Sequence, residues 1–244
     1  MEILLDCHCH TIASGHAYST VGEYAKEASE KGLELIAITD HGPKTPGMVF
    51  GDTYFLNLKA LQKKLYGVEI LTGIELNIIN ADGDVDLDNS MLRNLDVVIA
   101  SMHDVCITPQ TAKKNTKAVI NAIKNPYIKI IGHLGDPAFP IIVEDIVKAA
   151  GDYHTAIEIN EASCTGYRSG GEGTVRKLIE LGKAKKISFT WGSDAHFHTA
   201  IGEFDNIRKI SLDTGLNEND ILNTSIIRFK DFIAQRDLNN LSEV

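Results

Sequence analysis

Short apolar runs recur about every thirty residues along this chain, each followed by a polar loop and an amphipathic stretch. Most of the runs are near-continuous in Val, Ile and Leu rather than alternating, which is typical of strands covered on both faces. We therefore predict strands at 3–6, 35–39, 69–74, 97–101, 129–132, 156–160 and 188–191.

The amphipathic stretches between these runs predict helices. Thr20 and Glu23 have the spacing of a capping box, which predicts a helix over 21–31, and Gly32 follows as a stop signal. Strands and helices that alternate in this way predict a parallel sheet. Further helices are expected at 53–66, 110–124, 143–150, 174–181 and 226–236.

Seven strand–helix units fill the chain from residue 3 to about residue 213. An insertion at 76–79 and 85–87, around an Asp-Gly turn, predicts a hairpin after the third strand. The remainder, about 216–240, looks helical and is expected to pack on the outside of the sheet. We find no linker and expect a single domain over 1–244, either a closed barrel or an open α/β sheet.

The composition is that of an ordinary globular protein. Of 244 residues, 43% are hydrophobic and 23% charged, and the formal net charge is -9. The apolar runs are far shorter than the roughly 20 residues of a membrane span, and the acidic balance disfavours long nucleic acid as a partner. The four cysteines lack zinc-finger spacing and the N-terminus lacks signal-peptide features, so we expect a cytoplasmic protein with reduced thiols.

Ionisable side chains stand at the ends of six of the seven predicted strands. Because α/β barrels and open α/β sheets place their active sites at the carboxyl ends of the strands, we expect these side chains to converge. They are His8, His10, His41, Glu75, His103, His133, Asp194 and His196. His16 lies in the loop after the first strand and is less well supported by spacing alone.

This set of residue types indicates a metal site. Residues two apart on a strand point to the same face, so His8 and His10 can share one ion. Cys7 and Cys9 are expected on the other face, buried against covering helices. A catalytic zinc uses about three protein ligands, so the full set suits two or three ions with a bridging carboxylate. Imidazole and carboxylate ligands favour zinc, iron or manganese over magnesium or calcium.

The charge of such a site indicates its substrate class. Three divalent ions beside two carboxylates and a bound hydroxide would leave a pocket of about +3 inside an acidic protein. This pocket would attract a dianionic phosphate, and ions a few ångströms apart can activate a shared water and hold the attacking and leaving oxygens. The sequence therefore indicates hydrolysis of a phosphate ester.

In combination, these motifs resemble the PHP (polymerase and histidinol phosphatase) superfamily, and the resemblance covers nearly the whole chain. It rests on His8-x-His10, Thr39-Asp-His41-Gly, Gly73-x-Glu75, the single His103 and His133, and Gly192-Ser-Asp194-x-His196. The segment Ala13-Ser-Gly-His16-Ala-Tyr-Ser-Thr, the Asp-Gly turn at 82–83 and Gly202-Glu-Phe204 are similar to the stand-alone, YcdX-like phosphatase branch of the superfamily.

The resemblance implies a distorted (β/α)7 TIM-like barrel with three divalent metal ions at the carboxyl ends of its strands, and phosphatase activity on small phosphomonoesters. Zinc is the expected metal, with manganese or iron as alternatives. A hydroxide that bridges two ions near Glu75 and Asp194 would attack phosphorus, with no separate catalytic residue assigned. The implied ligands are His8, His10, Glu75 and Asp194 (first ligand set), Glu75, His103 and His133 (second ligand set), and His16, His41 and His196 (third ligand set).

Three further residues are weaker candidates. Arg168 and Asn160 are candidates for substrate binding, and Asp40 for a hydrogen bond that holds a neighbouring histidine. The glycine-rich loop at 166–173 is expected beside the site, and whether it acts as a lid stays open.

Other functions also stay open from the sequence. The nearest is a phosphodiesterase or exonuclease that acts on short nucleotides, and another is a non-catalytic, metal-stabilised PHP scaffold. A metal amidohydrolase would often carry a lysine on its fourth strand, where this chain has Ser101-Met-His103. Leu134 stands where the family often has proline, and Asp-Val-Cys106 stands where the branch often has Glu-Pro, so the substrate is left open, as is homo-oligomer formation.

Overall fold

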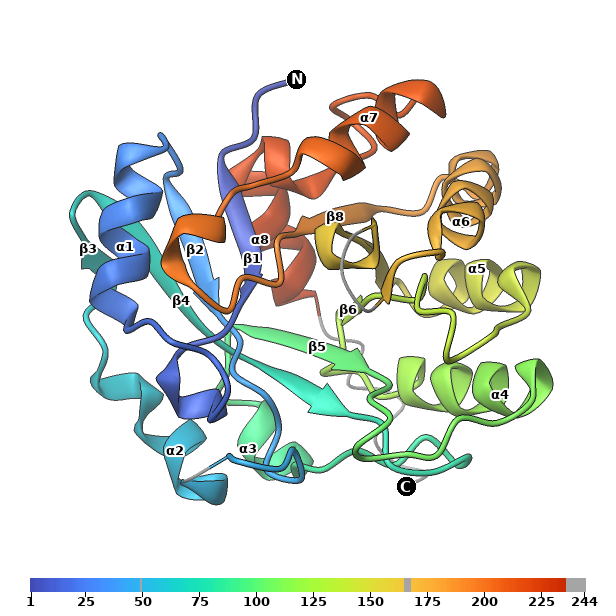
Figure 1. The fold of residues 1–244 in the computed structure, drawn as a ribbon, viewed down its shortest axis with the longest axis horizontal. Coiled ribbons are helices and arrows are strands. Elements are labelled where there is room, and N and C mark those ends of the chain that lie inside the picture. Colours follow the sequence, from blue (N-terminus) through green and yellow to red (C-terminus); the bar gives the residue numbers. More distant parts are fainter. Residues whose placement is uncertain (49, 165–167, 236–244) are drawn as a thin grey trace.

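A nearly closed barrel of parallel strands forms the centre of the molecule (Figure 1). The computed structural model describes residues 1–48, 50–164 and 168–235. The predicted strands are present in the order β1-β2-β4-β5-β6-β7-β8 and pair in parallel, while the additional β3 pairs antiparallel with β4. The strands are β1 (Leu5–Cys9), β2 (Leu35–Ile38), β3 (Lys64–Leu65), β4 (Val68–Asn77), β5 (Val97–Ser101), β6 (Ile130–Ile131), β7 (Ala156–Asn160) and β8 (Phe189–Gly192).

The barrel closes where the loop after β8 lies beside β1. Ala195 forms a parallel bridge with Cys9, and the His10 N–H donates to the Ala195 carbonyl at 2.9 Å. The Asp194 N–H donates to the His8 carbonyl, also at 2.9 Å. These bonds join the first and last strands at their carboxyl ends, and they confirm the predicted (β/α)7 TIM-like barrel.

The side chain of Asn223 also bridges the two strands, between Leu5 of β1 and Trp191 of β8. Its amide donates to the Leu5 carbonyl at 3.0 Å and to the Trp191 carbonyl at 2.8 Å. Its Oδ1 accepts the Trp191 N–H at 2.7 Å. A buried side chain therefore satisfies backbone groups that a regular barrel would pair between strands, and the barrel is distorted at this seam.

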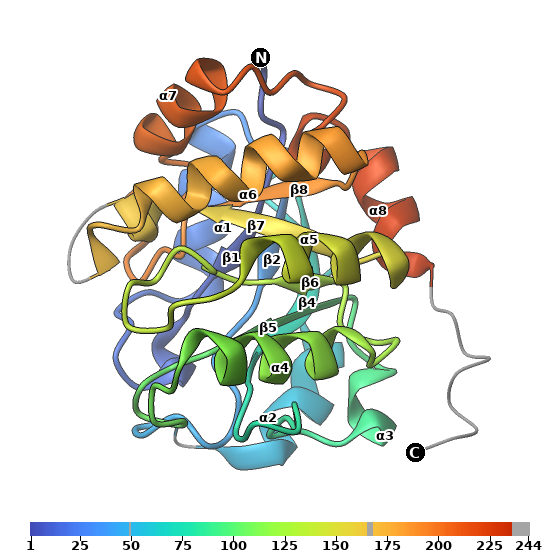
Figure 2. The same ribbon diagram turned by 90° about the vertical axis from the view of Figure 1, so that its right-hand side faces the viewer.

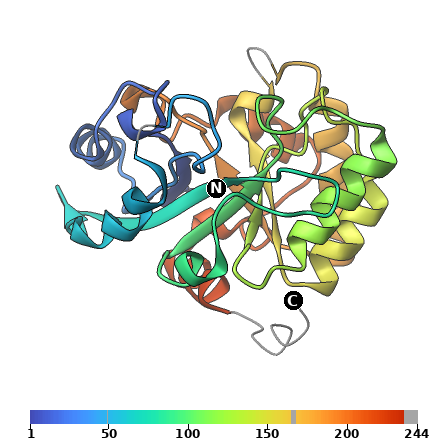
Figure 3. The same ribbon diagram turned by 90° about the horizontal axis from the view of Figure 1, so that it is seen from below.

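Helices cover the outside of the barrel. Figure 2 shows α4, α5 and α6 side by side along one flank, and Figure 3 shows α1 (blue) on the opposite side. The capping box predicted at the start of α1 is present, with reciprocal bonds between Thr20 and Glu23. The helices are α1 (Val21–Glu30), α2 (Gly51–Asn57), α3 (Asn89–Leu92), α4 (Ala112–Ile123), α5 (Val143–Asp152), α6 (Glu172–Lys185), α7 (Asp205–Asp213) and α8 (Ile226–Ala234). None of the helices in the described residues is long and apolar enough to span a membrane.

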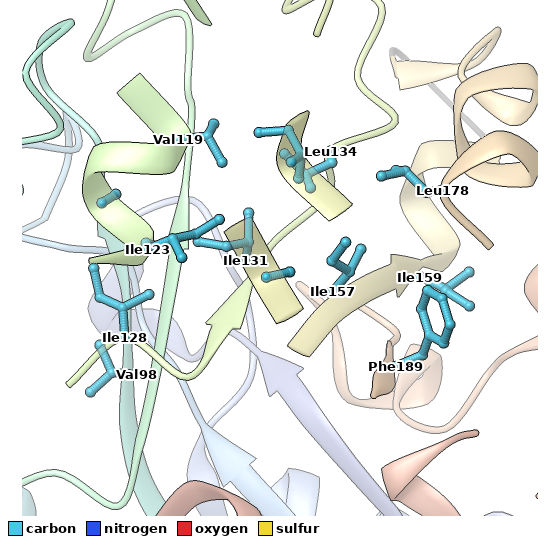
Figure 4. Packing of buried hydrophobic residues seen from close by; sticks show 14 of the residues in the cluster. Val98, Val119, Ile123, Ile128, Ile131, Leu134, Ile157, Ile159, Leu178 and Phe189 are labelled. Carbon is cyan, nitrogen blue, oxygen red and sulfur yellow. The ribbon is translucent and has the colours of Figure 1, made fainter. Parts of the chain in front are cut away.

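Two of the three apolar clusters carry most of the packing between these layers. One joins the outer face of the sheet to α4, α5 and α6, and Figure 4 shows Ile131, Ile157, Val119 and Leu178 within it. The other fills the barrel interior, where Phe229 of α8 packs among residues from the first halves of the strands. Those residues include Leu5, Leu35, Val97 and Ala156. The amino end of the barrel is therefore sealed by apolar side chains, and the carboxyl end is left to polar residues.

The C-terminal region is less helical than predicted. The expected helix over 226–236 is α8, which ends at Ala234, and residue 236 lies outside the described residues. Before α8 there is only a 3-10 turn at Leu222–Thr224, and its middle residue, Asn223, donates to both edge strands.

The cysteines of β1 correct one prediction. Both are buried, but only Cys9 packs against α1, where it meets Tyr24. Cys7 lies in the interior cluster, and its thiol donates to the Trp191 carbonyl at 3.5 Å. The pairing of β1 with β2 shifts register between Asp6 and Cys9. This bulge breaks the two-residue alternation on which the prediction rested.

The predicted helix over 53–66 is wrong in its second half. α2 is followed by a 3-10 turn at Leu58–Ala60, and β3 then pairs with β4. Tyr66 and Gly67 have φ values of 50° and 87°, as a two-residue hairpin turn requires. Pairing with β4 therefore outweighs the helical periodicity of this segment, because propensity is weaker than tertiary context.

The predicted hairpin at 76–87 is shorter than expected. Leu76 and Asn77 extend β4 and pair in parallel with β5. Only beyond them does Ile78 form an antiparallel bridge with Val85. As a result, β4 carries Asn77 as well as Glu75 to the carboxyl end of the barrel.

Candidate metal centre

The structure brings all of the predicted ligands together at the carboxyl end of the barrel. Glu75 lies in β4, and its backbone forms a parallel bridge with His41, which follows β2. The other ligands come from β1 or from the loops after β1, β5, β6 and β8. Within each of the three ligand sets, the side chains lie close to one another.

In the first ligand set, His8 of β1 and His10, directly after β1, meet two carboxylates. The Nε2 atoms of His8 and His10 lie 3.1 Å apart. Asp194 Oδ1 lies 3.0 Å from His10 Nε2, and Glu75 Oε1 lies 3.4 Å from His8 Nε2. All four side chains are buried.

The second ligand set is built on the same oxygen of Glu75. Glu75 Oε1 lies 2.9 Å from His133 Nε2 and 3.3 Å from His103 Nε2. The two imidazole nitrogens are 3.1 Å apart. Glu75 therefore touches members of both sets, as a bridging carboxylate would.

The third ligand set consists of imidazoles alone. His16 Nε2 lies 3.2 Å from His41 Nε2 and 3.1 Å from His196 Nε2. His41 Nδ1 lies 2.7 Å from Glu75 Oε2, without the alignment of a hydrogen bond. His10 is also close enough to His41 and His196 to share an ion with them. His41 thus connects the third set to the other two.

The chemistry of these groups fits cations. Tetrahedral zinc with bonds of about 2.05 Å places its ligand atoms about 3.3 Å apart, which is close to the spacing within each ligand set. Among the described residues, the buried atoms without a hydrogen-bond partner include His41 Nδ1, Glu75 Oε2 and Asp194 Oδ1. Buried polar atoms are normally satisfied, and clustered lone pairs at these distances repel one another unless a proton or cation lies between them.

Burial and neighbouring charge act in opposite directions on Glu75. Burial alone would raise the pKa of Glu75, but positive charge on His103 and His8 holds that pKa well below its ordinary value. Burial lowers the pKa of His10, and charge on His41 lowers it further. A metal ion would take over the role of this positive charge, because it binds the deprotonated forms of these side chains.

Two of the predicted ligands have left-handed backbone geometry. The φ values are 28° for His133 and 56° for Asp194. Such a residue costs about 1–3 kcal/mol in strain, and strained residues concentrate at functional sites. The His133 N–H donates to Glu158 Oε2 at 2.9 Å, and the Asp194 N–H donates to the His8 carbonyl. These bonds offset part of the strain and fix both turns.

Sequence reasoning missed two buried residues that contact the ring nitrogens facing away from the ligand sets. Glu158 Oε1 lies 2.5 Å from His8 Nδ1, and Asn77 Oδ1 lies 2.7 Å from His103 Nδ1. Glu158 did leave a signal, because it interrupts a strand predicted to be covered on both faces, where charge is unusual. Asn77 fell in the predicted hairpin and gave no such signal.

Asp40 reaches the ligands through another side chain. Its carboxylate accepts hydrogen bonds from the Thr11 N–H at 2.7 Å, from Ser14 Oγ at 2.6 Å and from the Tyr54 hydroxyl at 2.5 Å. Ser14 Oγ in turn lies 3.4 Å from His10 Nδ1. The expected direct bond to a histidine is thus replaced by a contact through Ser14, which sequence reasoning missed.

Arg168 and Asn160 both lie against Asp194. Arg168 is only 2% exposed, and its guanidinium donates to Asp194 Oδ2 at 2.5 Å. Burial alone would raise the pKa of Asp194, but charge on Arg168 holds that pKa well below its ordinary value. The Asn160 amide lies 3.0 Å from Glu158 Oε2 and 3.5 Å from Asp194 Oδ2.

The glycine-rich loop at 166–173 is described only in part, since residues 166 and 167 lie outside the described residues. Its last part packs tightly against the segment after β6. A Cβ atom on Gly171 would overlap the Gly135 carbonyl. The end of the loop is therefore fixed next to the turn that carries His133.

Comparison with known proteins shows which family this chain matches. The chain matches the PHP domain family over residues 6–162. It is 46% identical over 237 residues to a probable phosphatase of Thermoanaerobacter sp. (strain X514), which covers 97% of this chain and 96% of that protein. It is 38% identical over 236 residues to a probable phosphatase of Clostridium acetobutylicum, over 97% and 96% of the two chains.

Solved structures share the fold at low sequence identity. The histidinol phosphate phosphatase of Lactococcus lactis, complexed with zinc, L-histidinol and phosphate, has a TM-score of 0.62 and 19% identity, over 87% of this chain and 94% of that chain. The putative histidinol phosphatase of Listeria monocytogenes has a TM-score of 0.62 and 18% identity, over 83% and 99%.

Proposed function

Because this chain belongs to the PHP domain family, we propose that it is a metal-dependent phosphatase that hydrolyses small phosphomonoesters. One observation carries the proposal: two sets of imidazole and carboxylate groups and a third set of imidazoles meet at the open end of one barrel, and Glu75 belongs to the first two. The names of the relatives agree with this activity. The proposal treats residues 1–244 as one catalytic domain.

The ligand sets would hold three divalent ions. Glu75 would bridge the first two, and zinc suits the mixture of imidazole and carboxylate better than magnesium or calcium does. When bound, the ions would act as Lewis acids that activate a water molecule and stabilise charge on the phosphate oxygens. Manganese or iron would suit the same ligands.

The chain itself would supply orientation and charge balance. Arg168 and Asn160 lie against Asp194, so we propose that they hold this carboxylate in place rather than reach the substrate. The Ser14 hydroxyl, held by Asp40, would orient His10 and also accepts the His41 N–H at 3.1 Å. These contacts would keep the ligands in position before metal and substrate arrive, which is how preorganised sites avoid reorganisation during the reaction.

Phosphate release tests the proposal. Protein reconstituted with zinc or manganese is incubated with sugar phosphates, nucleotides and one chromogenic monoester, and free phosphate is measured. The site variant is Glu75→Gln, and the matched control is Glu180→Gln on the exposed face of α6. We expect release by the wild type and by the control, and none above background by Glu75→Gln.

The substrate panel also distinguishes the alternatives. Hydrolysis of dinucleotides without release from monoesters would indicate a phosphodiesterase or exonuclease. A protein that holds its metal ions and releases no phosphate from any ester would be a metal-stabilised scaffold. Either result would refute the proposed phosphomonoesterase.

A further inference from the structure

We propose that Glu158 is a positioning residue that fixes the first and second ligand sets relative to each other, an inference that rests on the metal centre proposed above. Glu158 lies in the middle of β7 and points into the barrel, between the apolar interior cluster and the ligands. It is 3% exposed. Its partners are His8 Nδ1, the His133 N–H and the Asn160 amide, so its effect would pass through His8 and His133.

The first contact fixes the tautomer of His8. Glu158 Oε1 lies 2.5 Å from His8 Nδ1, and both side chains are completely buried or nearly so. A carboxylate accepts hydrogen bonds only, so His8 Nδ1 carries a proton in this contact. The other ring nitrogen, Nε2, is then the one that offers a lone pair to a metal ion. Such carboxylate–histidine pairs are the usual way in which proteins orient metal-binding imidazoles.

The second contact fixes the turn that carries His133. Glu158 Oε2 accepts the backbone N–H of His133 at 2.9 Å, and the Asn160 amide at 3.0 Å holds the same oxygen in place. His133 has a φ of 28°, so this turn needs a strong partner to persist. A hydrogen bond to a buried carboxylate supplies one.

The two contacts converge on one atom of the site. His8 Nε2 and His133 Nε2 lie 3.4 Å and 2.9 Å from the same oxygen, Glu75 Oε1. The carboxylate of Glu158 therefore sets the positions of two imidazoles around the carboxylate of Glu75. The third ligand set has no member among the partners of Glu158 described here, so it would be independent of this residue.

The surrounding backbone is shaped to admit Glu158. Gly192 of β8 lies against its carboxylate, and a Cβ atom at this position would overlap Glu158 Oε1 and press on His8 Cβ. Gly132 lies on the other side, where a Cβ atom would sit 3.4 Å from Glu158 Oε2 and would overlap Ser101 Oγ. The absence of a side chain at Gly192 lets the carboxylate approach His8, whereas the close contact at Gly132 is with Ser101.

The experiment compares Glu158→Gln with Glu180→Gln, the same change on an exposed helix face. A glutamine at 158 can accept from one partner with its oxygen, but its amide then faces the other N–H, donor to donor. Zinc affinity is measured by competition with a chelator, and anomalous diffraction at the zinc edge identifies which ions remain. We expect zinc affinity at the first and second sets to fall 10- to 100-fold, with the third set and the control unchanged.

The possible outcomes separate this inference from the proposed function. Equal weakening of all three ions, or no weakening, overturns the positioning role even if the wild type is an active metallophosphatase. A wild type that binds none of zinc, manganese or iron overturns both. If Glu158→Gln fails to fold, Glu158→Asp keeps the charge but shortens the reach by one methylene. It should show the same selective loss in smaller degree, and wild-type affinity at every set would contradict the inference.

Discussion

Replacement of Glu75 by glutamine is the most informative perturbation of this site. The change keeps the size and shape of the side chain and removes one negative charge. In the structure Glu75 Oε1 lies within 3.4 Å of three imidazoles, those of His8, His103 and His133. Glu75 Oε2 lies 2.7 Å from His41 Nδ1. No other carboxylate in the proposed ligand sets is shared by two of them.

The size of the expected effect follows from these contacts. Loss of a residue that only supports a ligand typically costs 10- to 100-fold in metal affinity. A direct ligand should cost at least the upper value, and 100-fold corresponds to about 2.8 kcal/mol for each ion. Because Glu75 is a member of the first and second ligand sets, two ions should be weakened together, whereas the third set keeps its own ligands His16, His41 and His196.

The assay measures zinc content and phosphate release on the same samples. Thermal unfolding with EDTA present shows whether the apo variant still folds, and Glu180→Gln is the matched control. We expect Glu75→Gln to retain about one ion of three and to lose turnover. Wild-type zinc content in a folded Glu75→Gln variant would refute the bridging role.

Three further predictions follow from the same geometry. Removal of metal with EDTA should lower Tm, and zinc should restore it, because ions that bind only the native state stabilise it; an unchanged Tm would argue against a metal centre. His16→Ala should remove the third ion alone, and a uniform loss of all ions in the zinc assay would contradict the assignment. Asn223→Ala should lower the free energy of unfolding by about 2–4 kcal/mol, since it leaves three buried backbone groups without their partner. The loss is measured by denaturant unfolding. A loss of less than about 0.5 kcal/mol would contradict the prediction and would mean that water or local shifts replace the amide.

The positions of the ligands could be predicted because errors of a few residues in the strand boundaries do not move a residue to the other end of a parallel sheet. The predicted first strand, 3–6, is observed as Leu5–Cys9, and the predicted fifth strand shrinks to Ile130–Ile131. In both cases the histidines still lie at the carboxyl end of the strand or just beyond it. Every carboxyl end of a parallel sheet faces the same side, so errors of a few residues do not separate the ligands.

The partners that hold the ligands could not be predicted in the same way. Glu158 belongs to the barrel interior only because β7 pairs in one register, and a shift of one residue would turn it towards the helices. The position of His16 depends on the preceding residue, Gly15. Gly15 has a φ of 81°, and the absence of its side chain leaves room for the Gly47 carbonyl. Such contacts arise when the loops after β1 and β2 pack together, which no pattern within a single segment records.

Metal binding and closure of the barrel should be coupled in this protein. The first ligand set takes His8 from β1, His10 from the residue after β1 and Asp194 from the loop after β8, at the two ends of the sheet. The same residues also form the closing backbone bond, from the Asp194 N–H to the His8 carbonyl. An ion held by this set would therefore link the first and last strands directly. Since the set does not exist in the unfolded chain, its binding free energy adds to that of folding. At this seam β1 and β8 are joined partly by the side chain of Asn223, whereas β4 and β5 pair directly along their backbones. Without metal, we therefore expect the amide hydrogens of β1 and β8 to exchange faster than those of β4 and β5. Equal protection of all four strands in apo and zinc-loaded protein would refute this coupling.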